Sequence, residues 1–332
     1  MTWRMPAEWE KHERTWVAFP TSGYTLGDTQ SEHEAARTTW ANVANQASEF
    51  EKVTVVVNPG DESIAKKFLS SQIELVPIAI DDAWIRDSGP TFVVGNGQLG
   101  AVNWVFNGWG AQGWAEFGKD AKLATEIASH VSATRIDSEL VNEGGGIHIS
   151  QDGTVLLTET VQLGKGRNPS WSKEQVEQEI HQKLGTSKAI WLKRGLTRDY
   201  EEFGTQGHVD IVACFAPDGR VLYHDQKNPN HPDYQVSSEV RETFIRAGLE
   251  VVSIPAPDTL TDHEGYVDYS YINHYVLNNG VLLCSFDDPR DKEAKAILRE
   301  VYPGREIVLV DAKELFKRGG GIHCITQQQP AI

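Results

Sequence analysis

The sequence predicts an α/β fold in which about five hairpin-helix-strand units close into a ring around a central channel. Two observations carry this prediction. Asn-Gly or Asp-Gly turn signals recur at nearly constant spacing, and helical segments and short apolar strands recur between them. Because each unit buries one face against the next, we expect one domain over residues 1–332. An open α/β sheet is the alternative, but its helices would connect parallel strands without so many hairpins.

Four turn signals mark the hairpins. Their glycines lie 56, 66 and 61 residues apart along the chain, at Gly97, Gly153, Gly219 and Gly280. Each follows Asn or Asp and is flanked by strand-like residues, which is the strongest short-range signal for a hairpin. A nearly constant period over this length indicates a repeat architecture.

The segments between the hairpins predict the remaining elements. Helices are expected at residues 31–50, 61–70, 118–131, 172–184, 237–247 and 289–302. Ser172 followed by Gln175 has the pattern of a capping box. Short apolar strands are expected at residues 53–57, 73–80, 188–192, 250–254 and 307–310. The ring closes if the C-terminal strand pairs with the N-terminal strand near residues 16–19.

Composition limits the function. The chain of 332 residues carries 47 acidic and 31 basic side chains, a net charge of −16. This balance argues against nucleic acid or an anionic membrane as partner and favours a small cationic molecule. The N-terminal segment has no apolar signal region, and no apolar run reaches the roughly 20 residues that span a bilayer. We therefore expect a cytoplasmic protein, and a homo-oligomer is compatible with the sequence.

Acidic side chains occupy equivalent positions before three of the hairpins. Asp87, Glu143 and Asp210 precede their turn glycines by 10, 10 and 9 residues. Equivalent positions in a ring of repeats lie at one end of the channel, so these carboxylates are expected to converge. His208 lies two residues before Asp210, and two such positions in a strand face the same side.

The last unit contributes a thiol. Cys324 follows three glycines in the segment GGGIHC, which repeats the GGGIH of residues 144–148. We expect Cys324 on a strand just past a glycine turn, where a nucleophile can sit at a pocket floor. The alternative is a small buried cysteine without chemistry. Three widely spaced cysteines give neither a disulfide framework nor a zinc motif.

Three acids, a histidine and a thiol in one place favour a bound cation. A metal is chemically possible, but no paired ligand motif supports it. A guanidinium fits better, because carboxylates grip its N–H forks bidentately and leave its carbon open to a thiolate. Each residue also has a structural alternative. Asp87 can pair with Arg86, Glu143 can bond the glycine-rich backbone, and His208 and Asp210 can pair with each other.

Four motifs carry a resemblance to a known family. They are WIRDSGP at residues 84–90, NEGGGIH at 142–148, GHVD at 207–210 and GGGIHCITQQQP at 319–330. In this order they resemble the agmatine deiminase family of the guanidine-modifying pentein superfamily. The resemblance runs over nearly the whole chain. It implies a five-fold pseudosymmetric α/β propeller, in agreement with the repeat.

The resemblance implies an activity and roles for residues. The family hydrolyses agmatine to N-carbamoylputrescine and ammonia without metal or cofactor, a step of putrescine biosynthesis and polyamine metabolism. The nucleophile falls on Cys324, the general acid and base on His208, and the guanidinium-binding acids on Asp87 and Asp210. The glutamate near the histidine falls on Glu143. We also expect four further residues to line the substrate pocket: Asp82, Trp84, Gly320 and Gly321.

The chain departs from the family pattern around the tail of the substrate. Family members commonly have an acid and Asn before GHVD, where this chain has Gly204, Thr205 and Gln206. Other acids available to bind an amine are Asp82, Glu201, Glu202 and Asp268. Other guanidines therefore stay open as substrates: arginine, peptidyl arginine or a guanidino acid. A guanidinium-binding protein without turnover is a further alternative, which retention of both Cys324 and His208 opposes.

Overall fold

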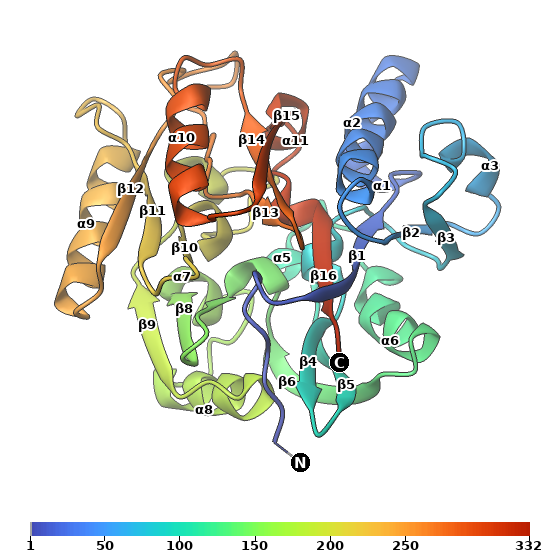
Figure 1. Cartoon of the computed structure of the whole chain (residues 1–332), viewed down its shortest axis with the longest axis horizontal. Coiled ribbons are helices and arrows are strands. Elements are labelled where there is room, and N and C mark those ends of the chain that lie inside the picture. The colour runs from blue at the N-terminus through green and yellow to red at the C-terminus, as the bar shows by residue number, and fades with distance from the viewer. Residues whose placement is uncertain (1) are drawn as a thin grey trace.

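Five small sheets surround the centre of the molecule in the computed structural model, which describes residues 2–332 (Figure 1). Four of them share one plan, in which an antiparallel hairpin is joined by a third, parallel strand. Their strands are β4 (Thr91–Gly95), β5 (Gln98–Val105) and β6 (Thr134–Val141); β7 (His148–Ile149), β8 (Thr154–Thr158) and β9 (Lys188–Leu192); β10 (Ala213–Phe215), β11 (Val221–Asp225) and β12 (Val251–Pro255); β13 (Tyr275–Val276), β14 (Gly280–Ser285) and β15 (Glu306–Asp311). The predicted five-fold α/β propeller is confirmed, built from separate sheets.

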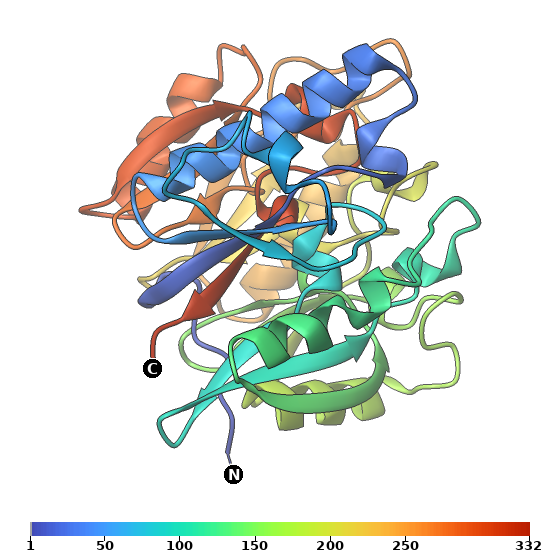
Figure 2. The same ribbon diagram turned by 90° about the vertical axis from the view of Figure 1, so that its right-hand side faces the viewer.

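The fifth sheet joins the two ends of the described chain. Strand β16 (Thr326–Pro330) pairs antiparallel with β1 (His12–Ala18), and β2 (Val53–Val57) and β3 (Glu74–Pro77) extend the sheet in parallel. Figure 2 shows β16 and β1 side by side. The expected pairing of the two terminal strands is confirmed. It completes the ring with a similar plan, an antiparallel pair extended by parallel strands, although the paired strands here are far apart in the sequence.

Amphipathic helices pack against the sheets. In α9, Val236, Val240 and Phe244 are buried at a spacing of four residues, as one helix face against a sheet requires. Ser172 and Gln175 form the predicted capping box of α8. The longer helices are α2 (Gln30–Ser48), α6 (Asp120–His130), α8 (Lys173–Leu184), α9 (Asp233–Arg246) and α10 (Asp291–Val301). The short ones are α1 (Gly23–Leu26), α3 (Glu62–Ala65), α4 (Ile85–Ser88), α5 (Gly108–Ala111), α7 (Glu159–Gln162) and α11 (Lys313–Phe316).

Several boundaries differ from the sequence prediction for physical reasons. Helix α3 ends at Ala65 rather than at residue 70, because the Asn45 amide on α2 bonds the backbone of Phe68 and Ser70. Strand β3 ends at Pro77, which has no N–H to donate. Helix α9 starts four residues earlier than predicted, since Pro232 presets a helical φ at its N-terminus.

The predicted hairpins are present, but their glycines serve different purposes. Asn96 and Gly97 have φ of 52° and 71°, the left-handed pair that a tight two-residue hairpin needs. Gly280 lies inside β14 instead of in the turn. A Cβ there would lie 2.6 Å from the Phe50 ring, so this glycine makes room for packing.

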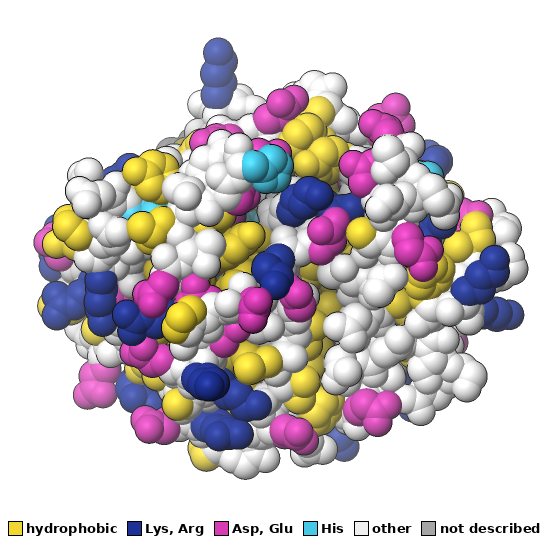
Figure 3. All heavy atoms as spheres, turned by 90° about the horizontal axis from the view of Figure 1, so that it is seen from above, with side chains coloured by type: hydrophobic (Ala, Val, Ile, Leu, Met, Phe, Trp, Pro, Cys, Tyr) yellow, Lys and Arg dark blue, Asp and Glu magenta, His cyan; other side chains and the backbone are white. Residues whose placement is uncertain are grey.

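The surface carries mixed charge. Figure 3 shows acidic and basic side chains interspersed over one face of the molecule. Within residues 2–332, none of the helices combines the length and the apolar character needed to cross a membrane.

Candidate active site

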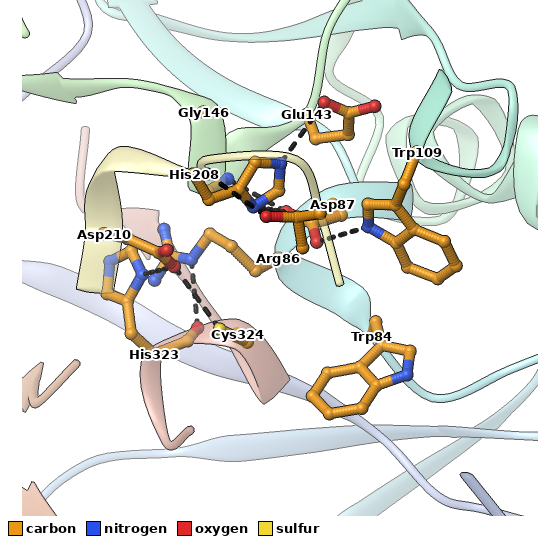
Figure 4. A network of polar contacts seen from close by, with 12 residues as sticks. Trp84, Arg86, Asp87, Trp109, Glu143, Gly146, His208, Asp210, His323 and Cys324 are labelled. Carbon is orange, nitrogen blue, oxygen red and sulfur yellow. Dashed lines mark hydrogen bonds and ion pairs between the residues drawn. The ribbon is translucent and has the colours of Figure 1, made fainter. Parts of the chain in front are cut away.

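Five predicted residues meet at the centre of the ring and are named here the central cluster: Asp87, Glu143, His208, Asp210 and Cys324 (Figure 4). Gly145 shows how close they lie. A Cβ at this glycine would lie 2.5 Å from His208 Nδ1 and 3.0 Å from Asp210 Oδ2 and Asp87 Oδ1. Only 1% of His208 and 5% of Cys324 are exposed. The cluster is therefore a dry site in which charges interact strongly.

Cys324 lies in a 3₁₀ turn, His323–Ile325, directly before β16. The prediction of a strand position was wrong, because the Thr326 hydroxyl bonds the carbonyls of Ile322 and His323 and holds a tight turn there. Cys324 Sγ lies 3.4 Å from Asp210 Oδ2 and 3.3 Å from Asn273 Nδ2. The turn thus presents the sulfur to the other members of the cluster.

The surroundings of Cys324 favour the neutral thiol. Burial raises its pKa well above the ordinary value, and the nearby carboxylates of Asp210 and Asp87 add to the rise. The Gly321 backbone N–H and the Asn273 amide act in the other direction, because they can donate to a thiolate. A cation bound between the two aspartates would offset the part of this rise in pKa that their charges cause.

His208 does not lie in a strand, as the sequence predicted, but at the start of a 3₁₀ turn over Val209–Ile211. Two left-handed residues, Gln206 (φ 72°) and Gly207 (φ 111°), turn the chain into it. The Asp199 carboxylate accepts the backbone N–H groups of Gly207 and His208 at 2.7 and 3.0 Å. His208 and Asp210 share the site because of this turn, not because of strand alternation.

The His208 ring is surrounded by carboxylates. Its Nε2 lies 3.3 Å from Glu143 Oε2, and its Nδ1 lies 3.8 Å from Asp87 Oδ1. Burial opposes protonation, but Asp87, Glu143 and Asp210 raise the pKa of His208 to about 9. At neutral pH the ring is therefore an imidazolium that can act as a general acid.

Glu143 is held ionised by an arginine. Burial alone would raise the pKa of Glu143, but Arg167, whose Nε lies 3.0 Å from both carboxylate oxygens, and His208 hold it below the usual value. Arg167 also donates to the Thr205 carbonyl at 2.7 Å. Arg167 thus links Glu143 to the chain segment that precedes His208. Arg167 was not among the site residues predicted from the sequence, because no motif or spacing pairs it with Glu143.

The two aspartates keep different bonding capacities. Asp87 accepts from Trp109 Nε1 and from the Gly145 N–H, both at 2.9 Å, and burial raises its pKa. Asp210 Oδ2 lies 2.9 Å from His323 Nδ1, whereas its Oδ1 is buried and has no partner within residues 2–332. His208 Nδ1 is unpartnered in the same sense. An unpaired buried acceptor is costly, so Asp210 Oδ1 is suited to receive an N–H of a ligand.

A second layer of charge lies behind Asp210. His323 bridges Asp210 and Glu8, with its Nε2 2.7 Å from Glu8 Oε1. The other Glu8 oxygen lies 3.7 Å from His148 Nε2, and Arg86 Nη1 lies 3.6 Å from Glu8. Burial and Arg86 oppose protonation of His323, but Glu8 and Asp210 raise its pKa above the ordinary value. The sequence signal for this layer was the repeated GGGIH, although its two histidines were not predicted to meet.

The predicted pocket-lining residues fall into two places. The Trp84 ring and Cys324 Sγ both face Gly320, whose missing Cβ would lie 2.8 and 3.0 Å from them. Gly321 packs against Asn273. Asp82 lies apart from the central cluster: its carboxylate accepts from the backbone N–H groups of Ala83 and Thr25, and it borders a separate cavity.

Aromatic side chains beside the cluster pack against one another and connect segments that are far apart in the sequence. Tyr24 stacks on Phe203 with 3.8 Å between ring centroids, and Trp109 stacks on Trp114 at 5.3 Å. Trp114 also contacts Phe203 edge to face. Trp109, at φ 57°, is held in the left-handed region. Trp109 therefore belongs both to this aromatic group and to the hydrogen bonds of Asp87.

Comparison with known proteins agrees with this geometry. The profile of the family described as Porphyromonas-type peptidyl-arginine deiminase matches residues 4–330. The chain belongs to this family. A relative of this chain, a putative agmatine deiminase of Streptomyces coelicolor, is 55% identical over 99% of both chains.

Two further family members extend the comparison. The agmatine deiminase of Ectopseudomonas mendocina is 37% identical over 98% of this chain and 95% of its own. The solved structure of the agmatine deiminase of Enterococcus faecalis is 30% identical, with a TM-score of 0.90 over 99% of this chain and 96% of that chain. The resemblance to the agmatine deiminases drawn from the four motifs is confirmed.

Proposed function

We propose that this chain hydrolyses agmatine to N-carbamoylputrescine and ammonia through a covalent amidino-cysteine intermediate. The observation that carries the proposal is the convergence of a thiol, an imidazolium and two aspartates. Asp210 Oδ2 lies 3.4 Å from the sulfur, and its Oδ1 is left unpaired. This set supplies a cation grip, a nucleophile and a proton donor at one point. The agmatine deiminases among its relatives support agmatine as the substrate.

In the first half-reaction, the guanidinium enters between Asp87 and Asp210 and neutralises the charges that keep the thiol protonated. The thiol releases its proton to solvent water, and the Cys324 thiolate forms a bond to the guanidinium carbon. The adduct is a neutral tetrahedral species. His208 then donates its proton to one amino group, the C–N bond breaks, and ammonia leaves. A cationic amidino-thioether remains on Cys324.

In the second half-reaction, neutral His208 takes a proton from water, and the oxygen adds to the same carbon. The C–S bond breaks as the new hydroxyl gives its proton to the departing sulfur, which yields the urea and regenerates the Cys324 thiol. His208 is again an imidazolium, held in that state by Glu143 and Asp87. Arg167 keeps Glu143 ionised throughout. The overall reaction consumes one water and releases one ammonia.

The decisive experiment measures ammonia and ureido product from four compounds: agmatine, arginine, 4-guanidinobutanoate and a peptidyl arginine. We expect agmatine to turn over fastest. Preferred turnover of another compound would preserve deimination and overturn the assignment of agmatine. Absence of ammonia from all four would contradict the proposed chemistry.

Three further properties follow as predictions from the proposed reaction and composition. The product serves putrescine biosynthesis, the protein works in the cytoplasm, and neither a metal nor another cofactor takes part. Activity that survives exhaustive dialysis against a chelator would support the last point. Size-exclusion chromatography with light scattering would establish whether the chain forms the homo-oligomer that its sequence allows.

A further inference from the structure

A small cavity lies directly beside the central cluster. Its lining includes Asp199, Phe203, Gly204, Asp268 and Gly319, and its volume is about 50 Å³. Two lining residues connect it to the reacting groups. Asp199 accepts the backbone N–H of His208, and Gly319 precedes Gly320, which faces the sulfur. In agmatine, five bonds separate the substituted guanidino nitrogen from the amine. When extended, this part of the molecule is about as long as roughly two residues of extended polypeptide.

Asp268 is the partly buried acid of this cavity that is not committed to another residue; Glu202 and Lys317 also line the cavity, but both are exposed to solvent. The Asp268 carboxylate is partly buried and accepts no hydrogen bond from another residue within residues 2–332. Asp199, by contrast, is used by four donors from Thr205, Gly207 and His208. Arg198, a basic residue of the same lining, is already paired with another carboxylate, because its Nη1 lies 3.0 Å from both oxygens of Asp262.

The loop before His208 cannot supply the acid itself. A Cβ on Gly204 would lie 2.2 Å from the Asp199 carbonyl oxygen, so position 204 has no room for a side chain. In family members the acid that precedes GHVD lies on this loop. Asp268 borders the same cavity from another segment and provides a carboxylate there.

We propose that Asp268 binds the distal ammonium of the substrate, an inference that rests on the proposed deimination of agmatine. Two further features of the cavity fit an ammonium. The stacked rings of Tyr24 and Phe203 border it, and aromatic rings attract a cation that lies close to them. A volume of about 50 Å³ holds an ammonium group but excludes a peptide backbone, so the cavity selects a free amine over a peptidyl arginine.

The electrostatics of Asp268 support a cationic occupant. Burial and the charge of Asp199 raise the pKa of Asp268 to about 7. The ionised carboxylate is therefore disfavoured in the empty cavity, and an ammonium would relieve this repulsion. Binding of the amine and ionisation of Asp268 reinforce each other.

The test compares Asp268→Asn with the wild type on two substrates. Agmatine carries the amine, and n-butylguanidine has the same guanidinium and the same four-carbon chain with a hydrogen in place of the amine. We expect kcat/KM for agmatine to fall about 10- to 100-fold, mainly through KM, because a charge-assisted hydrogen bond is lost. For n-butylguanidine we expect less than about a threefold change. The control is Asp28→Asn, which removes an exposed acid from the neighbouring cavity that Asp82 borders, and should leave both substrates unaffected.

Three results would overturn the inference. Equal losses on both substrates would mean that Asp268 supports structure only. A loss confined to agmatine in Asp28→Asn would place the amine in the other cavity. Unchanged kinetics in Asp268→Asn would remove its role altogether. If Asp268→Asn does not fold, Asp268→Glu serves instead, because a longer side chain in so small a cavity must also raise KM for agmatine alone.

Failure of the proposed function is distinguishable from failure of this inference. If the wild type releases no ammonia from either compound, the deimination proposal fails. Calorimetry on Cys324→Ser then still compares agmatine with n-butylguanidine. Tighter binding of agmatine by at least about tenfold, lost in the double variant with Asp268→Asn, supports the ammonium site, and equal affinities contradict it.

Discussion

The segment GGGIH occurs twice in the chain, and the two copies build different parts of one site. In the first copy, Gly145 donates its N–H to Asp87, and its missing Cβ opens the space between the charged groups. In the second copy, Gly320 leaves room beside Trp84 and the sulfur of Cys324. The histidines of both copies, His148 and His323, reach the same carboxylate of Glu8.

The partners of the two histidines differ, and this difference separates their roles. His148 Nδ1 accepts the Phe215 backbone N–H at 3.2 Å, a neutral contact. His323 Nδ1 meets the Asp210 carboxylate at 2.9 Å, and the pKa of His323 is raised. Equal local sequences thus yield a packing residue in one unit and a charged support of the reacting groups in another. The comparison shows that the ring position, not the motif, decides function.

The largest expected loss of activity comes from replacing Cys324, the residue that follows the second GGGIH copy. Replacing Cys324 by Ser should lower kcat for agmatine by at least roughly 10⁴-fold, because the nucleophile is lost while the cation grip remains. The equivalent residue after the first copy is Ile149, and Ile149→Val should retain activity near the wild-type level. Mass spectrometry of a rapid quench should detect an amidino adduct on the wild type and none on Cys324→Ser. Undiminished turnover by Cys324→Ser would contradict the mechanism.

The first copy can be tested through its glycines. Gly145→Ala should lower kcat about 10²- to 10³-fold, because the new methyl group enters the space shared by His208, Asp210 and Asp87. The matched control is Gly146→Ala, whose Cβ would approach no atom closer than 3.2 Å. Steady-state kinetics measure kcat of both variants, and thermal unfolding shows whether each variant is folded. Equal activity of the two would refute the assigned geometry.

Glu143, which directly precedes the first GGGIH copy, stabilises the protonated form of His208, and this predicts that the stability of the protein depends on pH. The folded pKa of His208 is about 9, above the ordinary value of 6.5. Its stabilising contribution is therefore fully present below about pH 6.5 and is lost as pH rises through about 9, by roughly 3 kcal/mol at most. Urea unfolding of the wild type and His208→Asn between pH 6 and 9.5 tests this. The difference in unfolding free energy between them should shrink with rising pH, and a constant difference would disagree.

The two histidines should give the smallest activity losses. His323→Gln should lower kcat/KM about 10- to 30-fold, because Asp210 loses its charged partner, whereas His148→Gln should lose less than about threefold. The pH profile separates positioning from simple structural damage. Without the His323 cation the pKa of Asp210 rises, so the acid limb of the profile should move to higher pH in His323→Gln only. Identical profiles for both variants would remove the distinction between the copies.

The repeat could be predicted from the sequence because turn residues and hydrophobic periodicity depend on residues that are close together in the chain. Asn96-Gly97 and the Ser172 capping box required only short-range rules. Strand conformation at His208 and Cys324 was predicted wrongly. The Asp199 carboxylate accepts the His208 backbone N–H, and the Thr326 hydroxyl donates to the Ile322 carbonyl, and these bonds hold 3₁₀ turns there. Such side-chain bonds to the backbone leave no periodic trace.

The members of the central cluster could be named from matched offsets and motifs, but their environment could not. Asn273 bonds Cys324, and Trp109 bonds Asp87, across 51 and 22 residues of chain. Asp268 was one of four acids open to an amine on sequence grounds. Asp268 and Gly204 line one cavity, and its shape depends on how loops from different units pack against each other. The sequence pattern of a single unit does not predict that packing.

The pairing of β16 with β1 has a consequence for how the protein comes into being. The sulfur lies two residues before a strand whose partner was made more than 300 residues earlier, as the register of Trp16 with Gln327 records. A growing polypeptide therefore carries the carboxylates and the imidazole before the thiol that they serve has been made. The reactive centre is complete only when the segment with Cys324 and β16 has been made and β16 pairs with β1, so a chain that has not reached this segment lacks the nucleophile.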